Sequence, residues 1–186
     1  MIPPRVVGID PSLTSTGLAD NTGRTLRVRG PRMGATLLND LARITHIATV
    51  VREFAAYGPG HVAHPADLAV IEGPAYSRGQ MGGQHAKAGS WWLIVDNLAS
   101  AGIPILVVPP NVRAMYATGK GNAGKDEVLA AVVKRYPGYD VDSNDIADAL
   151  AMCALGARLL GHPIDDLPKT HLRALAKLTH PLKGTR

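Results

Sequence analysis

The chain of 186 residues contains a single cysteine, Cys153, and no long hydrophobic run. One thiol excludes an intrachain disulfide framework and a cysteine-rich zinc site, and it fits a reducing compartment. No apolar run approaches the roughly 20 residues that a membrane span requires, and no apolar signal segment precedes the first expected strand. We therefore expect a cytoplasmic protein with no membrane partner, in which Cys153 lies in the core.

Several signatures of enzymatic chemistry are also missing. The sequence has no G-x-x-x-x-G-K-[ST] phosphate loop, no Ser-His-Asp or Cys-His nucleophile pattern, and no pair of histidines at metal-ligand spacing on one helix. Nucleotide hydrolysis on a P-loop and covalent catalysis by serine or cysteine are therefore disfavoured. The carboxylates become the main candidates for chemistry.

The net charge of +5 lies at the C-terminal end of the chain. Residues 167–186 contain five lysines and arginines and no acid, so the rest of the chain is neutral overall. Such a segment attracts phosphate, or it only keeps the protein in solution. Because a chain of this length holds one hydrophobic core, we predict one domain over residues 1–162 and a basic C-terminal tail over residues 163–186.

The hydrophobic pattern predicts an α/β fold. Short β segments are expected over residues 5–10, 16–19 and 25–30, which form an antiparallel meander, and further buried strands over 67–72 and 103–108. Helical spacing or helix signals occur over residues 35–57, 85–101, 125–136 and 144–160, and residues 111–124 are expected to form a polar loop. The predicted architecture is a five-stranded mixed sheet, three antiparallel strands and then two parallel ones, with helices on both faces.

Four carboxylates stand where they could meet. Asp10 and Glu72 each end a buried strand, and Asp145 and Asp148 lie three residues apart on one face of a helix. Singly, such acids often form turns or decorate a helix N-terminus. Together they suit Mg²⁺ or Mn²⁺, and a pair of such ions about 3.5–4 Å apart supports phosphodiester chemistry.

These segments resemble a known family. Residues 8–17 (GIDPSLTSTG), Ile71-Glu72 and residues 145–151 (DIADALA) are similar to motifs of the RuvC family of Holliday junction resolvases, which belongs to the RNase H-like superfamily. The resemblance covers about residues 5–160. It implies an RNase H-like fold and makes residues 1–162 a RuvC-like nuclease domain.

The resemblance also implies an activity. It predicts a crossover junction endodeoxyribonuclease, a hydrolase that resolves four-way junctions and other branched DNA in recombination and repair. Asp10, Glu72, Asp145 and Asp148 would hold two Mg²⁺ ions, with Mn²⁺ as a substitute, and water would leave a 5′-phosphate and a 3′-hydroxyl. Asp10 would bridge both ions.

The resemblance also implies that basic and aromatic residues near the acids bind the DNA. Lys125 and Arg113 stand where the family has two lysines that bind phosphate, so Arg113 departs from the family pattern. Lys120 is an alternative to Lys125 for the second position. Lys125 would act in catalysis as well. Tyr76 would stack on an unpaired base, and Arg78 in the following Gly-rich loop would approach the DNA backbone. Each of these residues has an ordinary surface role as its alternative.

The resemblance extends to assembly. The helix with Trp91 and Trp92 matches the one through which the family forms a twofold homodimer. Adjacent tryptophans cannot share one helical face, so one could serve the core and the other an interface, or both could be core. The compact motif set looks like bacteriophage members, which would act in the host cytoplasm; a cellular member would act at the nucleoid.

Other functions stay open at this point. The four acids are shared across RNase H-like enzymes, so a nuclease with looser preference for flaps, forks or RNA is one alternative. A noncatalytic junction-binding protein is another, although bases would suit it better than four acids. The hydroxyl-rich segment after Asp10 is also similar to the phosphate loop of sugar kinase and actin-like ATPases, whose fold is a duplicated form of this one.

Overall fold

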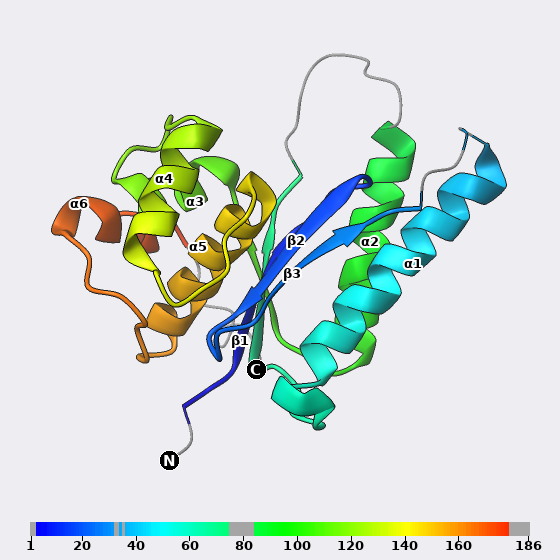
Figure 1. The fold of residues 1–186 in the computed structure, drawn as a ribbon, viewed down its shortest axis with the longest axis horizontal. Helices are drawn as coiled ribbons and strands as arrows, with labels where there is room; N and C mark the ends of the chain where they lie inside the picture. The colour runs from blue at the N-terminus through cyan, green and yellow to red at the C-terminus, as the bar shows by residue number, and fades with distance from the viewer. Residues whose placement is uncertain (1–2, 32–33, 35, 75–83, 179–186) are drawn as a thin grey trace.

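A computed structural model describes residues 3–31, 34, 36–74 and 84–178. Its centre is a five-stranded sheet in the order β3-β2-β1-β4-β5 (Figure 1). The strands are β1 (Val6–Asp10), β2 (Ser15–Asp20), β3 (Thr25–Arg29), β4 (Leu68–Glu72) and β5 (Ile105–Val108). β1, β2 and β3 pair antiparallel, whereas β4 is parallel to β1 and β5 is parallel to β4. The predicted fold class is confirmed.

Helices cover both faces of the sheet. They are α1 (Leu37–Ala56), η1 (Pro59–His61), α2 (Gln84–Ser100), α3 (Pro110–Thr118), α4 (Lys125–Arg135), α5 (Asn144–Leu159), α6 (Lys169–Leu172) and η2 (Leu175–Lys177). α1 and α2 lie on one face, and α5 lies on the other with α3 and α4 beyond it. None of the helices in the described part of the chain is long and apolar enough to cross a membrane.

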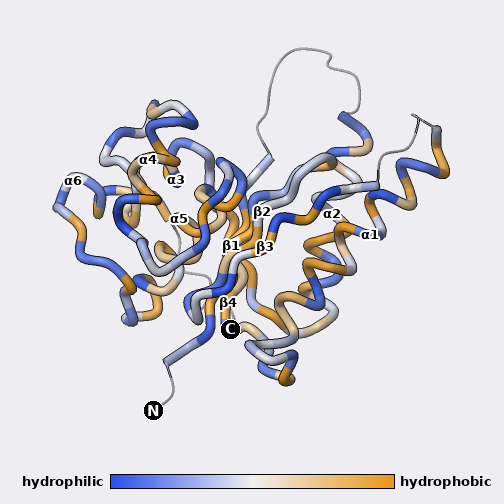
Figure 2. Tube along the Cα trace, in the orientation of Figure 1, coloured by the Kyte–Doolittle hydropathy of each residue, from blue (hydrophilic) through white to orange (hydrophobic). Residues whose placement is uncertain are grey.

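The core lies in two layers, one on each side of the sheet. Side chains alternate along a strand, so Val7 and Ile9 of β1 pack towards α1 and α2, while Val6 packs towards α5. The two central strands, β1 and β4, are buried on both faces and are apolar throughout until their last residue (Figure 2). An acid at the end of such a strand therefore sits at the rim of the core.

The predicted loop over residues 111–124 is wrong in its first half, which is helix α3. Pro110 occupies the first turn, where the missing N–H costs nothing, and Gly119 ends the helix at φ 81°. Val112 and Tyr116, one turn apart, are buried against the core. The two prolines start this helix, although such a pair is also typical of the end of a strand followed by coil.

Helix α5 begins at a defined cap. The N-cap is Ser143, whose hydroxyl accepts a hydrogen bond from the N–H of Ile146. Asp145 then falls in the first turn of the helix. Cys153, further along α5, is fully buried as expected, and its thiol donates to the carbonyl of Val6 at 3.3 Å.

The segment after α5 packs on the domain as far as residue 178. Leu167 and Ala174 are buried in the core layer of α5. The hydroxyls of Tyr116 and Tyr136 both donate to Asp165, which also pairs with Arg158 at 2.6 Å. This part of the predicted tail thus contributes contacts to the core of the domain.

Candidate metal centre

Two acids lie at one edge of the sheet, where parallel strands end. Asp10 is the last residue of β1 and Glu72 is the last residue of β4. The pairing of Ile9 with Ile71 makes these two positions neighbours. Asp10 is 9% exposed and Glu72 is partly buried, so both carboxyl groups lie at the boundary between core and solvent.

Helix α5 brings the third acid because it packs directly on the backbone of β1 and β2. A Cβ at Gly8 would overlap the carbonyl oxygen of Ala149, and a Cβ at Gly17 would overlap that of Asp145. Only glycine permits this approach without a shift of the helix. The close packing places Asp148, which is 2% exposed, over the end of β1.

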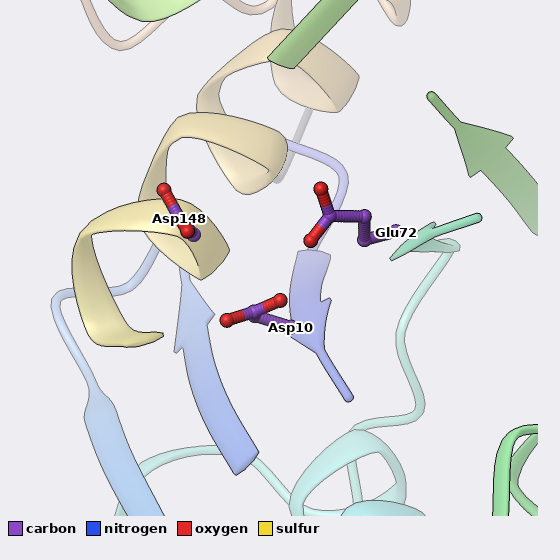
Figure 3. Close-up of side chains that lie close together, drawn as sticks. All are labelled: Asp10, Glu72 and Asp148. Carbon is purple, nitrogen blue, oxygen red and sulfur yellow. The ribbon is translucent and has the colours of Figure 1, made fainter. Parts of the chain in front are cut away.

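The side chains of Asp10, Glu72 and Asp148 converge from β1, β4 and α5 (Figure 3). One oxygen of each carboxylate lies within 4.8 Å of the other two. Three oxygen donors at this separation can surround a hard cation such as Mg²⁺ or Mn²⁺. The described residues thus contain a preformed group of candidate metal ligands.

Asp145, the fourth predicted ligand, stands beside this group. Its carboxylate accepts a hydrogen bond of 2.5 Å from the hydroxyl of Ser15, at the start of β2. It is not among the three acids whose oxygens converge, but its negative charge contributes to the raised pKa of Asp10. The structure therefore brings three of the four predicted acids together and holds the fourth beside them.

The electrostatics of the cluster favour an added cation. Burial raises the pKa of Asp10 well above its ordinary value of 3.8, and so do a hydrogen bond with Glu72 and the negative charges of Glu72 and Asp145. The charge of Arg113 acts in the opposite direction but does not cancel the rise. A carboxyl group that resists ionisation among other carboxylates is stabilised as an anion when a divalent ion binds.

Arg113 lies inside the acid cluster, on helix α3. It is 8% exposed, its Nη2 is 2.9 Å from Oε1 of Glu72, and its Nη1 forms an ion pair with Asp148. The sequence predicts a DNA-binding residue on a loop at this position. The loop is a helix, and binding of DNA by Arg113 stays a prediction.

The other predicted DNA contacts have different surroundings. Lys120 is exposed and its Nζ is 2.8 Å from Glu127, an ion pair that raises the pKa of the lysine. Lys125 is the exposed first residue of α4. Tyr76 and Arg78 lie outside the described residues. The roles of all four stay predictions.

Two side chains that sequence reasoning missed hold the acids in place. Ser15 donates to Asp145, and the indole N–H of Trp91 donates to the main-chain carbonyl of Glu72 at 2.9 Å. The hydroxyl-rich stretch before Gly17 was a signal for Ser15, but its partner is 130 residues away. Trp91 is partly buried and Trp92 is 65% exposed, so the two tryptophans face different surroundings and are not both core residues.

The chain is similar to known proteins over most of its length, although no protein-family model matches it. It is 31% identical over 161 residues to the crossover junction endodeoxyribonuclease RuvC of Hyphomonas neptunium, covering 83% of this chain and 90% of that protein. The protein of the same name from a Synechococcus strain is 28% identical over 170 residues, covering 82% and 97% of the two chains.

Solved structures have the same fold. The RuvC structure of Thermus thermophilus superposes with a TM-score of 0.60 at 21% identity, covering 85% of this chain and 97% of that one. T. thermophilus RuvC in complex with a Holliday junction substrate gives 0.57 at 18% identity, covering 81% and 90%. The fold predicted from the sequence is therefore confirmed independently.

Proposed function

Since this chain belongs to the RuvC family of crossover junction endodeoxyribonucleases, we propose that it is a metal-dependent endonuclease that resolves four-way DNA junctions. The observation that carries the proposal is the convergence of Asp10, Glu72 and Asp148 within 4.8 Å. A protein that only bound DNA would gain nothing from buried acids facing a phosphate backbone. Acids at this place are useful when they hold cations.

The proposed ligands are Asp10, Glu72, Asp145 and Asp148, and the proposed ions are two Mg²⁺, with Mn²⁺ as a substitute. The donor set fits, because it consists of carboxylate oxygens at the rim of the core and has more acids than bases. When bound, such ions activate water for attack on a phosphodiester and stabilise the departing oxygen. The products are a 5′-phosphate and a 3′-hydroxyl.

The chain itself contributes placement. The hydrogen bond from Ser15 orients Asp145, and the hydrogen bond from Trp91 fixes the backbone at Glu72. Ser15 and Trp91 would not contact the ions; each would hold a residue that does. Lys120 and Lys125, both exposed, are the proposed contacts to DNA phosphates, and Lys125 lies at the start of α4.

A junction has two strands to cut, so we propose that the enzyme acts as a homodimer. Trp92 of α2, 65% exposed, supports this because a large exposed aromatic side chain suits an interface. The same proposal includes two further DNA contacts, stacking of Tyr76 on a base and contact of Arg78 with the DNA backbone. It also includes a nuclease domain that spans residues 1–162, and action in the cytoplasm of a bacterium or of a phage-infected host.

The test is cleavage of a synthetic four-way junction, beside flap, fork, linear duplex, single-stranded DNA and RNA substrates, with and without Mg²⁺. The variant is Asp145→Asn. The matched control is Asp142→Asn, which changes an exposed acid three residues earlier that pairs with Arg27 at 3.6 Å. We expect paired, symmetric nicks in the junction, lost in Asp145→Asn and kept in the control.

Three other results would count against the proposal. Equal cutting of flaps, forks or RNA would indicate the looser nuclease. Junction binding without metal-dependent cutting of any substrate would indicate the noncatalytic binder. Unchanged cutting by Asp145→Asn would remove Asp145 from the ligand set.

A further inference from the structure

The acid cluster already contains a cation, the guanidinium of Arg113. Its two terminal nitrogens contact two different acids, Glu72 through Nη2 and Asp148 through Nη1. These are two of the three residues whose oxygens converge. A divalent ion bound between the carboxylates would need the same oxygen atoms that the guanidinium now contacts.

The guanidinium is also weakly secured apart from these acids. Within the described part of the chain, Nε of Arg113 is buried without a hydrogen-bond partner. The backbone of Arg113 is fixed, since its N–H donates to the carbonyl of Pro109 in the first turn of α3. The backbone at Arg113 is thus fixed, whereas its guanidinium is held only by Glu72 and Asp148 among the described residues. Such an end can be exchanged for another cation without disturbing the helix.

The charge of the cluster supports an exchange. One guanidinium faces Glu72 and Asp148, with Asp10 beside them and Asp145 near enough to affect the pKa of Asp10. A single positive charge leaves the group net negative when all four acids are ionised. The attraction for a divalent cation therefore persists while Arg113 is in place.

We propose that Arg113 is an internal counter-cation of the metal centre, which bridges Glu72 and Asp148 in the metal-free protein and is displaced from them when a divalent ion binds. The inference rests on the proposed function, because it assumes that this cluster binds metal. It assigns Arg113 a positioning role: it holds two carboxylates close together before the ion arrives, and it lowers the affinity for that ion by competition.

The first experiment observes the displacement directly in the wild-type protein. The side-chain Nε–H signals of arginine are followed by ¹⁵N NMR during titration with Mg²⁺ alone. Arg5 is the internal control, because it is buried and its guanidinium hydrogen bonds lie away from the cluster. We expect the Arg113 signal to shift or broaden at saturating Mg²⁺ while the Arg5 signal stays. An unchanged Arg113 signal while Mg²⁺ binds would overturn the inference.

The second experiment measures affinity for Mn²⁺ alone by EPR, in the wild type, Arg113→Lys and Arg113→Met. Lysine keeps the charge but, as a point charge, cannot bridge two carboxylates as a planar fork does. We expect both variants to bind Mn²⁺ about tenfold more tightly than the wild type, a change of about 1.4 kcal/mol, because the guanidinium no longer competes for the carboxylates. Arg27→Lys, which alters a partly buried arginine on β3 that pairs with the exposed Asp142, should match the wild type.

The outcomes separate this inference from the proposed function. If Arg113→Lys binds Mn²⁺ like the wild type, only the overall charge matters, and the displacement is wrong while the metal centre stands. If neither the wild type nor the Arg113 variants bind Mn²⁺ or Mg²⁺, both proposals fail. Circular dichroism of each variant confirms that it is folded, and the NMR titration needs no variant.

Discussion

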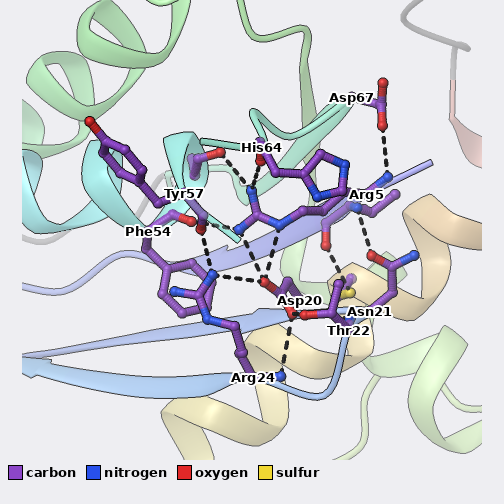
Figure 4. A network of polar contacts seen from close by, with 12 residues as sticks. Arg5, Asp20, Asn21, Thr22, Arg24, Phe54, Tyr57, His64 and Asp67 are labelled. Atoms are coloured by element: carbon purple, nitrogen blue, oxygen red, sulfur yellow. Dashed lines mark hydrogen bonds and ion pairs between the residues drawn. The ribbon is translucent and has the colours of Figure 1, made fainter. Parts of the chain in front are cut away.

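The two ends of strand β1 each hold a buried arginine among acids, but the two groups are built differently. At the start of the strand, Arg5 donates through Nε and Nη2 to Asp20, and through Nη1 and Nη2 to the carbonyls of Phe54, Ala55 and His64 (Figure 4). These five hydrogen bonds of 2.6–3.2 Å use all five N–H groups of the guanidinium. Arg5 and Asp20 both have fully buried side chains.

At the other end, Arg113 meets Glu72 and Asp148, and the acids outnumber the base. Nε of Arg113 and Oδ1 of Asp148 are buried atoms that lack a regular hydrogen bond among the described residues. Burial is comparable at the two ends, but the completeness of the hydrogen bonding is not. We infer that a complete network of this kind stabilises the fold, whereas an incomplete one marks where a ligand is expected.

Replacement of Arg5 by leucine should produce the largest effect on stability. The change removes the hydrogen bonds of Arg5 to the buried carboxylate of Asp20 and to three carbonyl groups, and breaking a buried pair from one side costs about 3–5 kcal/mol. Urea unfolding followed by circular dichroism measures this loss. The double variant Arg5→Leu/Asp20→Leu should recover part of it, and a loss below about 1 kcal/mol in the single variant would contradict the structural role.

Addition of Mg²⁺ should stabilise the protein through the opposite end of the strand. At a concentration of one hundred times the dissociation constant, a ligand of the folded state adds about 2.7 kcal/mol. Thermal unfolding with increasing Mg²⁺ should show a rising midpoint in the wild type and no rise in Asp10→Asn. An equal rise in both proteins would place the ion elsewhere.

Asp10→Asn should itself be more stable than the wild type when metal is removed by a chelator. The amide replaces a buried carboxyl group that resists ionisation in the folded protein but ionises freely in the unfolded chain, and relief of this kind gives about 1–2 kcal/mol. The size of this difference in stability depends on pH, because the pKa of Asp10 is raised above 3.8 in the folded protein. The unfolded chain ionises first as pH rises, so the wild type loses stability above about pH 4 and the advantage of the variant grows.

Chemical unfolding of Asp10→Asn and wild type at pH 4 and pH 8 tests this directly. The control is Asp142→Asn, at an exposed position, which should change little. A variant less stable than the wild type at pH 8 in chelator would mean that the charge of Asp10 is already compensated by the protein.

Ser15→Ala should have the smallest effect of the series. It removes one hydrogen bond to Asp145, worth about 0.5–1.5 kcal/mol, and leaves the three converging acids in place. We expect a small loss of stability and a loss of Mn²⁺ affinity of a few fold. Ser12→Ala, at a partly exposed position, is the control, and equal effects from both variants would show that Ser15 does not position Asp145.

Much of the fold could be predicted from local patterns. Strands β1 and β4 were predictable because they are short apolar runs that end in an acid, and α5 because of its apolar spacing and its cap at Ser143. Helix α3 was missed because two prolines usually interrupt structure, and their tolerance in a first helical turn depends on whether the next residues can pack as a helix.

In the candidate site, too, some residues could be predicted from local patterns and others could not. Asp10, Glu72 and Asp148 could be named from strand ends and helix spacing, and the structure brings them together. The pairing of Arg113 with Glu72 spans 41 residues, and no local pattern encodes a side chain that reaches from one helix to the end of a distant strand. Such contacts depend on how the helices pack on the sheet.

The hydrogen bonds to Asp165 affect the order in which the site is completed during synthesis. Asp165 accepts from Tyr116 on α3, the helix that carries Arg113, and from Tyr136, which caps α4. A growing chain exposes its N-terminal part first, so the strands with Asp10 and Glu72 leave the ribosome well before Asp165 does. The acids are thus made early, while the helix that carries their counter-cation obtains its hydrogen bond to Asp165 only after that residue has left the ribosome.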